Sequence, residues 1–418
     1  MQENTAHRAD PSAGESAAGR RLGAYLAMSA FLFLVLAGCG FDPARSPVRT
    51  ALVLTWPVAL LAFVVTGRAS AIVTYLLGGG LALRLAGLPG GGGSDVLAAT
   101  NEAIATLLAG GNPYDHFYSA TRPAGSPFPY PPVQLLIHLP GHLVAGLDGV
   151  QVTELAFAAV VMILFAGLAR RISWTAGLPA LAIYAGALDL VNLTVDGSND
   201  TSAGAVLLVA VLAFAWAWEH GWADRQLVVA GVTAALALGT KQSTLLVILV
   251  LAIALWQVAG RRATLRYVGS VLLVLALVSL PFLAMGPLVY LRGLVSFTTF
   301  HEDVYGWNIW VLARSLGWPV ADVGPAFVIE LALTAAALIV AAIHRYRDVA
   351  AATAAGILVT LVPLLTARWT TYAYFAMVAP VALAVPLLRS RHRRFIATSS
   401  AAADRGVVPA PEEGDPRA

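Results

Sequence analysis

A polar stretch between Gly90 and Gln134 interrupts a mostly apolar chain and holds the residues best suited to chemistry. Asp95 comes just after an apolar run, and a proline-stiffened aromatic segment follows at 127–132. A carboxylate held at a membrane surface can take the proton of an attacking hydroxyl group, which makes Asp95 a candidate general base. The alternative is that Asp95 only complements the dipole of a helix.

Asp95 is expected at the start of a surface helix. Ser94 has a side chain that favours helix starts, and Gly110-Gly111 is typical of a helix end. Glu102 follows Asp95 by seven positions, so both acids share one face of this helix. Glu102 is therefore a candidate substrate-binding residue, with a solvated helix face as the alternative.

The composition places these residues in a membrane protein. The chain has 418 residues, 58% hydrophobic and 12% charged, with a mean hydropathy of +0.76. Soluble domains carry about 25% charged residues, so a polytopic membrane protein is expected. The net charge of +3 and the dispersed arginines give no nucleic-acid footprint. Cys39 is the only cysteine, which rules out an internal disulfide; it either ends the first span or is a lipidation site.

Apolar runs long enough to cross a bilayer predict an all-α transmembrane bundle of about 12 spans. The predicted spans are Leu22–Cys39, Ala51–Thr66, Ala71–Leu88, Gln151–Ala169, Trp174–Asn192, Thr201–Glu219, Leu227–Thr240, Thr244–Ala259, Thr264–Ala284, Pro325–Ile343, Ala350–Thr366 and Thr370–Leu388. They belong to one transmembrane domain at 20–394, flanked by tails at 1–19 and 395–418 whose composition predicts disorder.

One segment decides the topology. Val133–Leu147 is short and contains histidines and a proline, so an interfacial or re-entrant helix is expected there instead of a span. Both termini are then cytoplasmic, with 18 of the 26 basic residues on the inner side. A thirteen-span arrangement gives the same division of basic residues between the two sides, so the shortness of Val133–Leu147 decides in favour of twelve spans. Two large outer loops result, at 88–150 and 285–324. The segments that are varied in polar and aromatic residues lie almost wholly on the outer face.

These outer segments hold further candidates for substrate binding. Tyr114 and Tyr130 belong to a crowd of outer aromatic residues, which either form an interfacial belt or stack on sugar rings. His301 stands in a second polar group, His301-Glu302-Asp303, for which a solvated loop is the alternative.

Two other features are weaker. His138 and His142 have the spacing of metal ligands, but Pro140 lies between them and no third ligand is evident, so no metal site is expected. Glu330 falls inside a predicted span, where a charge is costly, and the sequence assigns it no role.

The order of the motifs resembles the first outer loop of glycosyltransferase family 87, which belongs to the GT-C superfamily. The similarity covers residues 70–390 and is carried by Asp95, Asn112-Pro113-Tyr114 and Phe128-Pro129-Tyr130-Pro131-Pro132, then by Gly197-Ser198-Asn199, Gly239-Thr240-Lys241, Trp307-Asn308 and Arg368-Trp369. The chain departs from the family pattern in its two spans before residue 70, at Trp310, and at Thr370-Thr371-Tyr372.

The resemblance implies transfer of a sugar, mannose in that family, from a polyprenyl phosphate, with Asp95 at the position of the general base. A phosphate leaving group needs no second acid but does need cations. On the outer side the candidates are Lys241, which is the only lysine, Arg84, Arg122, Arg292, Arg314 and Arg368, with Lys241, Arg368 and Arg314 preferred. Lys241 has an alternative role as an interfacial anchor. Asn199 is a candidate substrate-binding residue through its family motif.

The expected function is therefore an integral-membrane glycosyltransferase, by the resemblance an α-mannosyltransferase, at the outer face of the plasma membrane. Its partners would be a polyprenyl-phosphate sugar donor, a glycan or glycolipid acceptor and membrane lipids; no cofactor is expected. The alternative is a transporter or lipid flippase, which would place polar residues along a path through the bilayer.

Overall fold

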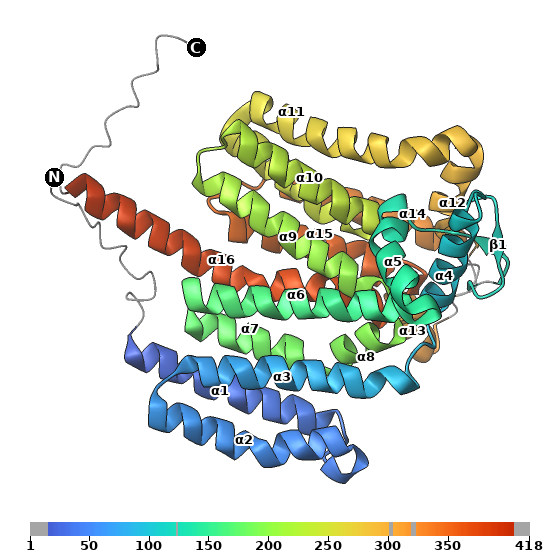
Figure 1. Ribbon diagram of the computed structural model, residues 1–418. Helices are drawn as coiled ribbons and strands as arrows, with labels where there is room; N and C mark the ends of the chain where they lie inside the picture. The colour runs from blue at the N-terminus through green and yellow to red at the C-terminus, as the bar shows by residue number, and fades with distance from the viewer. Residues whose placement is uncertain (1–15, 123, 301–303, 319–322, 405–418) are drawn as a thin grey trace, which may run out of the picture.

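The computed structural model describes residues 16–122, 124–300, 304–318 and 323–404 (Figure 1). Helices make up nearly all of this fold, which confirms the all-α prediction. The long helices are α1 (Ala17–Ala37), α2 (Pro47–Thr66), α3 (Ala69–Gly87), α6 (Gly149–Arg171), α7 (Trp174–Gly186), α9 (Asp200–Glu219), α10 (Asp224–Thr240), α11 (Leu245–Met285), α14 (Val323–Ile343), α15 (Val349–Thr366) and α16 (Tyr372–Asp404).

Shorter elements connect these helices. They are α4 (Asp95–Leu108), α5 (Pro132–Ala145), α8 (Leu188–Asp196), α12 (Pro287–Phe300), α13 (Ile309–Ser315) and the strands β1 (Phe117–Tyr118), β2 (Ser126–Pro127), β3 (Tyr305–Gly306) and β4 (Trp369–Thr370). Strands β1 and β2 form an antiparallel pair within the first predicted outer loop. Strands β3 and β4 pair in parallel, which ties the second predicted outer loop to the segment after α15.

The spans follow the predicted apolar runs. Nine helices or helix runs in the described part of the chain are long and apolar enough to cross a membrane, or ten if α7 and α8, bent by 53°, form one broken span. Two further predicted spans correspond to a shorter helix and to one arm of a longer helix. Helix α10, with 17 residues, is slightly short, and Gly260, with a φ of 78°, divides α11 into two arms.

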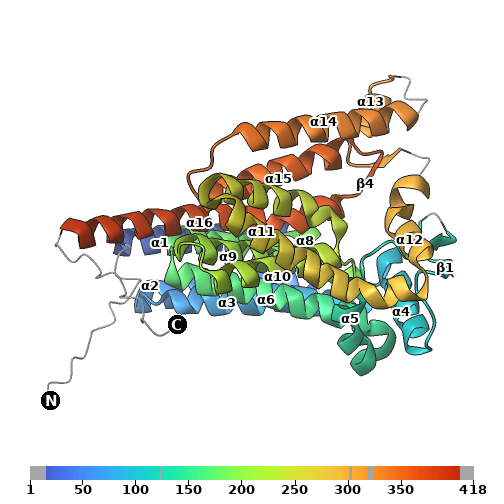
Figure 2. The same ribbon diagram turned by 90° about the horizontal axis from the view of Figure 1, so that it is seen from above.

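The connecting segments gather at two ends of the bundle. Figures 1 and 2 both show α4, α5, α12 and α13 at one end, hereafter the α4 end, and the start of α1 and the last turns of α16 at the other. At the α4 end Lys241 bonds to Asp200, and at the opposite end Arg391 pairs with Glu219. The structure thus separates the expected outer and inner segments as the twelve-span arrangement requires.

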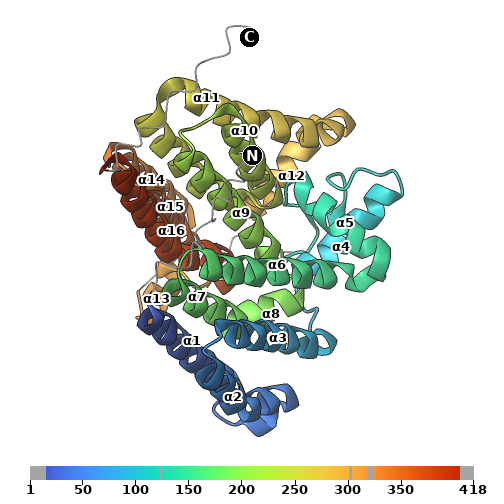
Figure 3. The ribbon, with the colours of Figure 1, turned by 60° about the vertical axis from the view of Figure 1, so that its left-hand side comes forward.

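Helix α9 is the centre of the bundle. Figures 1 and 3 place α10 and α11 on one flank of the molecule and α1 to α3 on the opposite flank. Close approach of helices depends on missing side chains, as is usual in membrane bundles. A Cβ atom added to Gly204 of α9 would lie 2.6 Å from the carbonyl oxygen of Met377 in α16. Because α9 is so enclosed, residues at its first turn have well-defined positions.

Helix α5 occupies most of the segment predicted as interfacial or re-entrant, and it does not cross the bundle (Figure 1). It folds back along the first turns of α6, where Nε2 of His138 lies 2.7 Å from a carboxylate oxygen of Glu154. The far end of α5 exposes Leu143 and Val144. Exposed aliphatic side chains at the end of a bundle suit the boundary between lipid and water.

The terminal helices extend into both segments that were expected to be tails. Residues Ala17–Gly19 form the first turn of α1, capped by the Ser16 side chain, and α16 continues to Asp404. Residues 395–404 are therefore helical, because the helix is already nucleated upstream and alanine, the best helix former, occupies four of these positions. Residues 1–15 and 405–418, the rest of the two expected tails, lie outside the described residues.

Arg84 of α3 holds the break between α7 and α8. Ala187 has an extended backbone at this break, so nearby carbonyl groups lose their usual helical partners. The buried guanidinium supplies replacements by donating to the carbonyl oxygens of Gly80, Tyr184, Ala185 and Leu190 and to the hydroxyl of Thr194. Arg84 is therefore a structural residue, although its position near the outer end of a span had made it resemble a phosphate-binding cation.

Replacing Arg84 with methionine should destabilise the protein by about 3 kcal/mol, because buried carbonyl groups at the helix break lose their donors. Thermal unfolding in detergent measures this loss. Arg45→Met is the matched control, since Arg45 is mostly exposed and pairs with Asp42 in a surface turn. Equal stability of the two variants would contradict the role assigned to Arg84.

Candidate functional site

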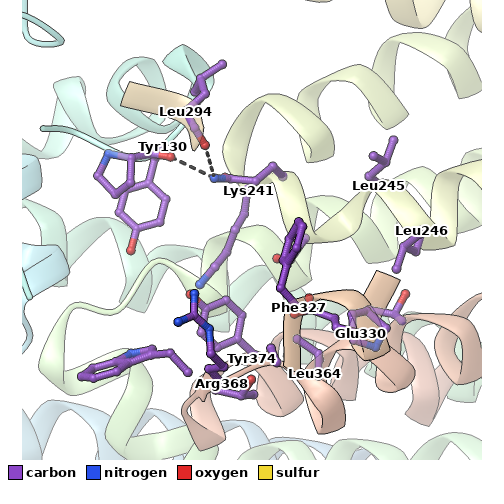
Figure 4. A pocket seen from close by; sticks show the side chains of 18 residues that line it. Tyr130, Lys241, Leu245, Leu246, Leu294, Phe327, Glu330, Leu364, Arg368 and Tyr374 are labelled. Atoms are coloured by element: carbon purple, nitrogen blue, oxygen red, sulfur yellow. Dashed lines mark hydrogen bonds between the residues drawn. The ribbon is translucent and has the colours of Figure 1, made fainter. Parts of the chain in front are cut away.

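A cavity of about 300 Å³ opens at the α4 end of the bundle (Figure 4). Its wall comes from the loop before α5, the start of α11, helices α14 and α15, strand β4 and the start of α16. In Figure 4, Lys241 and Arg368 lie on one side of the cavity, and Leu245 and Leu246 lie on the other. The cavity therefore has a charged part and an aliphatic part.

Lys241 is buried and already has an acidic partner. Its Nζ atom lies 2.6 Å from Oδ1 of Asp200 and 3.0 Å from Oδ1 of Asn199, both in the first turn of α9 or its cap. The same ammonium group stands 4.4 Å from the ring centroid of Tyr374 and 5.9 Å from that of Tyr130. Two of its three N–H groups are used by these oxygens, which leaves one donor for a ligand in the cavity.

Arg368 is the second cation of the cavity and has no acid at hydrogen-bond distance. Among the described residues no hydrogen bond or ion pair of its guanidinium is found, although its backbone is firmly held. Its carbonyl oxygen accepts from the backbone N–H of Tyr305 at 2.9 Å and from the side chain of Asn308 at 3.0 Å. The hydroxyl of Thr370, also in the cavity wall, is buried with no partner in the described residues. The guanidinium of Arg368 is therefore available to an anion in the cavity.

Asp95 is the first residue of α4, as predicted, and Ser94 caps the helix. The Ser94 hydroxyl lies 3.4 Å from that of Ser198, which brings the start of α4 next to the start of α9. The glycine run before it passes so close to Val195 that a Cβ at Gly91 would lie 2.3 Å from the Val195 carbonyl oxygen. Asp95 is half-buried and does not line the cavity, but its carboxylate is close enough to interact electrostatically with Tyr130 and Tyr374, which do.

Tyr130 connects Asp95 with the cavity. It lines the cavity, and its pKa lies well above the usual value, first because it is buried and then because Tyr374 and the carboxylates of Asp95 and Asp200 are near. Each of these effects disfavours a phenolate. Tyr130 therefore stays protonated and is available as a hydrogen-bond donor between the acid of α4 and the charged part of the cavity.

Tyr114 acts on the site through Tyr130. Its ring is buried against Phe128, Phe282 and Tyr290, and its hydroxyl donates to the carbonyl oxygen of Tyr130 at 2.8 Å. Burial raises the pKa of Tyr114 well above its usual value. The side chain holds the aromatic loop in place and is enclosed too fully to stack on a sugar.

Other predicted residues lie farther from the cavity. Glu102 is partly exposed on α4 and pairs with Nε2 of His116 at 2.8 Å. Arg314 is exposed on α13 and does not line the cavity. His301 lies outside the described residues. The structure therefore brings together Asp95, Tyr130, Asn199, Lys241 and Arg368, and it separates Glu102 and Arg314 from them.

The two histidines with metal-ligand spacing have separate partners. His138 pairs with Glu154, and Nδ1 of His142 lies 2.9 Å from the side chain of Asn101. Within the described part of the chain, no three His, Cys, Asp or Glu side chains are grouped so that they could hold a metal ion.

Two residues of the site had no role assigned to them from the sequence. Asp200, the partner of Lys241, stands directly after Asn199, and a lone lysine between two apolar runs was a signal that a buried acid was needed. Glu330 was noticed but not assigned, and it lines the cavity from α14. Its surroundings could not be read from the sequence, because α14 and β4 are brought together only by the fold.

This arrangement suits an amphipathic anion. Arg368 and the remaining donor of Lys241 can bind a phosphate group, and the aliphatic wall can hold a hydrocarbon chain. Asp95 interacts electrostatically with Tyr130 of the cavity wall and can accept a proton from a hydroxyl group. The three capabilities are those of group transfer from a lipid phosphate.

The pairing of Lys241 with Asp200 can be tested through stability. Lys241→Met and Asp200→Leu should each destabilise the protein by about 3–5 kcal/mol, because each leaves the buried charge of the other side chain uncompensated. The double variant Lys241→Met/Asp200→Leu should lose less than the sum of the two. Unfolding in detergent provides the measurement, and additive losses would show that the two side chains do not depend on each other.

The matched family model agrees with this chemistry. Residues 131–285, from just before α5 to the end of α11, match the family described as dolichyl-phosphate-mannose-protein mannosyltransferase. The matched part contains Asn199, Asp200 and Lys241 but neither Asp95 nor Arg368. No curated protein and no solved structure matches the chain. The family match, together with the apolar helices, points to a multi-pass membrane glycosyltransferase of the GT-C type.

Proposed function

We propose that this protein transfers a sugar, mannose by its resemblance to family 87, from a polyprenyl phosphate to a hydroxyl group of a glycan or glycolipid. The reaction takes place at the α4 end of the bundle, on the extracytoplasmic face of the plasma membrane. The observation that carries the proposal is the cavity itself. It joins an arginine that has no ion-pair partner among the described residues to an aliphatic wall, beside a carboxylate on α4.

The donor fits this cavity in one orientation. Its phosphate binds to Arg368, with the remaining N–H of Lys241 and the hydroxyl of Thr370 as further donors. Its isoprenoid chain lies along Leu245, Leu246 and neighbouring aliphatic residues, where burial of apolar surface adds about 25 cal/mol per Å². The sugar then extends from the phosphate toward Tyr130 and the start of α4.

The transfer needs one base. The acceptor oxygen attacks the anomeric carbon while the bond from that carbon to the phosphate oxygen breaks, and the phosphate leaves with the electron pair. Asp95 takes the proton of the acceptor hydroxyl. Arg368 stabilises the charge that develops on the phosphate, so no acid is needed to protonate the leaving group. Attack from the side opposite the phosphate inverts the anomeric centre.

The backbone at the start of α4 orients Asp95 for this step. One oxygen of the carboxylate accepts from the N–H of Val96 at 3.1 Å, which fixes the orientation of the group. Among the described residues its other oxygen has no hydrogen-bond partner, so it is available to an acceptor hydroxyl. The acceptor enters from the side of α4, where the first outer loop is exposed.

Asp95→Asn should lower the rate of sugar transfer by roughly a hundredfold or more, because the asparagine cannot take the proton. The assay is release of polyprenyl phosphate and labelling of acceptor from radiolabelled polyprenyl-phospho-mannose in detergent. Asp115→Asn is the control, since Asp115 is an exposed acid in the same loop. Near-normal turnover by the Asp95 variant would refute the assignment, and substrate movement across sealed vesicles without donor cleavage would support transport instead.

Arg368→Met should raise the KM for the donor by at least about tenfold, because a buried phosphate would lose its charged donor. Arg368→Lys should recover part of the loss through its charge. Arg292→Met serves as the control, since Arg292 is exposed on α12 at the same end. An unchanged donor KM in Arg368→Met, measured in the same detergent assay, would place the phosphate elsewhere.

A further inference from the structure

An acid lies inside the cavity. Glu330 is seven residues past the start of α14, which at about 1.5 Å per residue puts it roughly 10 Å along the helix from its end at the site. It lines the cavity with Phe327 and Leu364, and Figure 4 shows these three side chains near one another. Within the described residues it has no hydrogen bond or ion pair. A charge at membrane depth is costly and usually has a function.

The charged side chains near Glu330 determine how it affects an anion bound in the cavity. The guanidinium of Arg368 is close enough for the two charges to interact, although they are not in salt-bridge contact. Lys241 is balanced by Asp200. Among the described residues of its wall, the cavity therefore holds one cation free to bind an anion, Arg368, and one acid that opposes additional negative charge, Glu330.

We propose that Glu330 is a specificity-determining residue that makes the cavity select a phosphodiester over a phosphomonoester. The inference rests on the proposed function and goes beyond it. The sugar donor is a phosphodiester with one negative charge. The product, polyprenyl phosphate, is a monoester whose charge at neutral pH is between about −1.5 and −2.

The difference in charge arises from the reaction. When the bond between the anomeric carbon and the phosphate oxygen breaks, that oxygen keeps the electron pair and the lipid phosphate gains a negative charge. The accompanying proton goes from the acceptor to Asp95. Arg368 can compensate the first charge of the phosphate, but the second charge meets Glu330 instead of another free cation. Repulsion at this point favours release of the spent lipid and keeps it from competing with new donor.

The test compares two lipids that differ in a single charge. Farnesyl phosphate is the monoester, and its methyl ester is the diester with the same tail. Binding of each is measured in detergent at about pH 8, where the monoester carries nearly two charges. Wild-type protein should bind the diester more tightly than the monoester, despite the larger charge of the monoester. Glu330→Gln should bind the monoester roughly tenfold more tightly relative to the diester.

Two controls separate a charge effect from a structural one. Glu330→Asp keeps the charge and should restore the wild-type ratio of the two affinities. Asp42→Asn removes one negative charge from an exposed turn between α1 and α2 and should leave the ratio unchanged. If the role of Glu330 were purely structural, its substitution would change the affinities for both lipids by the same factor. Glu330→Ala replaces the glutamine variant if the latter does not fold.

The outcomes distinguish this inference from the proposed function. An unchanged ratio in Glu330→Gln, in a protein that still transfers sugar, overturns the role of Glu330 and leaves the function intact. A shifted ratio without any sugar transfer supports charge selection by the cavity but refutes the enzyme. If neither lipid binds to the wild type, the cavity is not a lipid-phosphate site and both proposals fail.

Discussion

The buried pair of Lys241 and Asp200 is the interaction on which the site depends. A lysine enclosed among helices must have a counter-ion, because an isolated charge in a medium of low dielectric is strongly unfavourable. Here the counter-ion stands on the first turn of α9, the central helix, and the lysine follows the last turn of α10. The ring of Tyr374 packs on the same ammonium group and adds α16 to the junction. Three helices are thereby joined where the cavity begins.

Much of this architecture could be predicted from local sequence. A segment surrounded by lipid must satisfy its own backbone hydrogen bonds, so apolar runs of sufficient length are helices. The start of α4 was predicted for a similarly local reason, since Ser94 caps it and glycines precede it. Val133–Leu147 is too short to cross a bilayer, which predicted that α5 does not span the bundle. In each case the information lies within a few turns of chain.

The assignment of charged residues required the fold. In sequence Arg84 and Arg368 look alike, since each is an arginine at the outer end of a predicted span. The structure separates them completely, because Arg84 donates to carbonyl groups at the α7–α8 break while Arg368 faces a cavity. Asp200 is likewise 41 positions from Lys241. Which acid meets which base depends on helix packing, and no local pattern records it.

The depth of the cavity argues for transfer over transport. Glu330 is seven residues from the start of α14, and Thr360, another residue of the wall, is six residues from the end of α15. At about 1.5 Å per residue both lie roughly 10 Å from the α4 end, whereas the hydrocarbon core is about 30 Å thick. A transport path would need polar groups beyond this depth. The proposed lipid donor needs none, because its phosphate would remain at Arg368 while its tail stays in the bilayer.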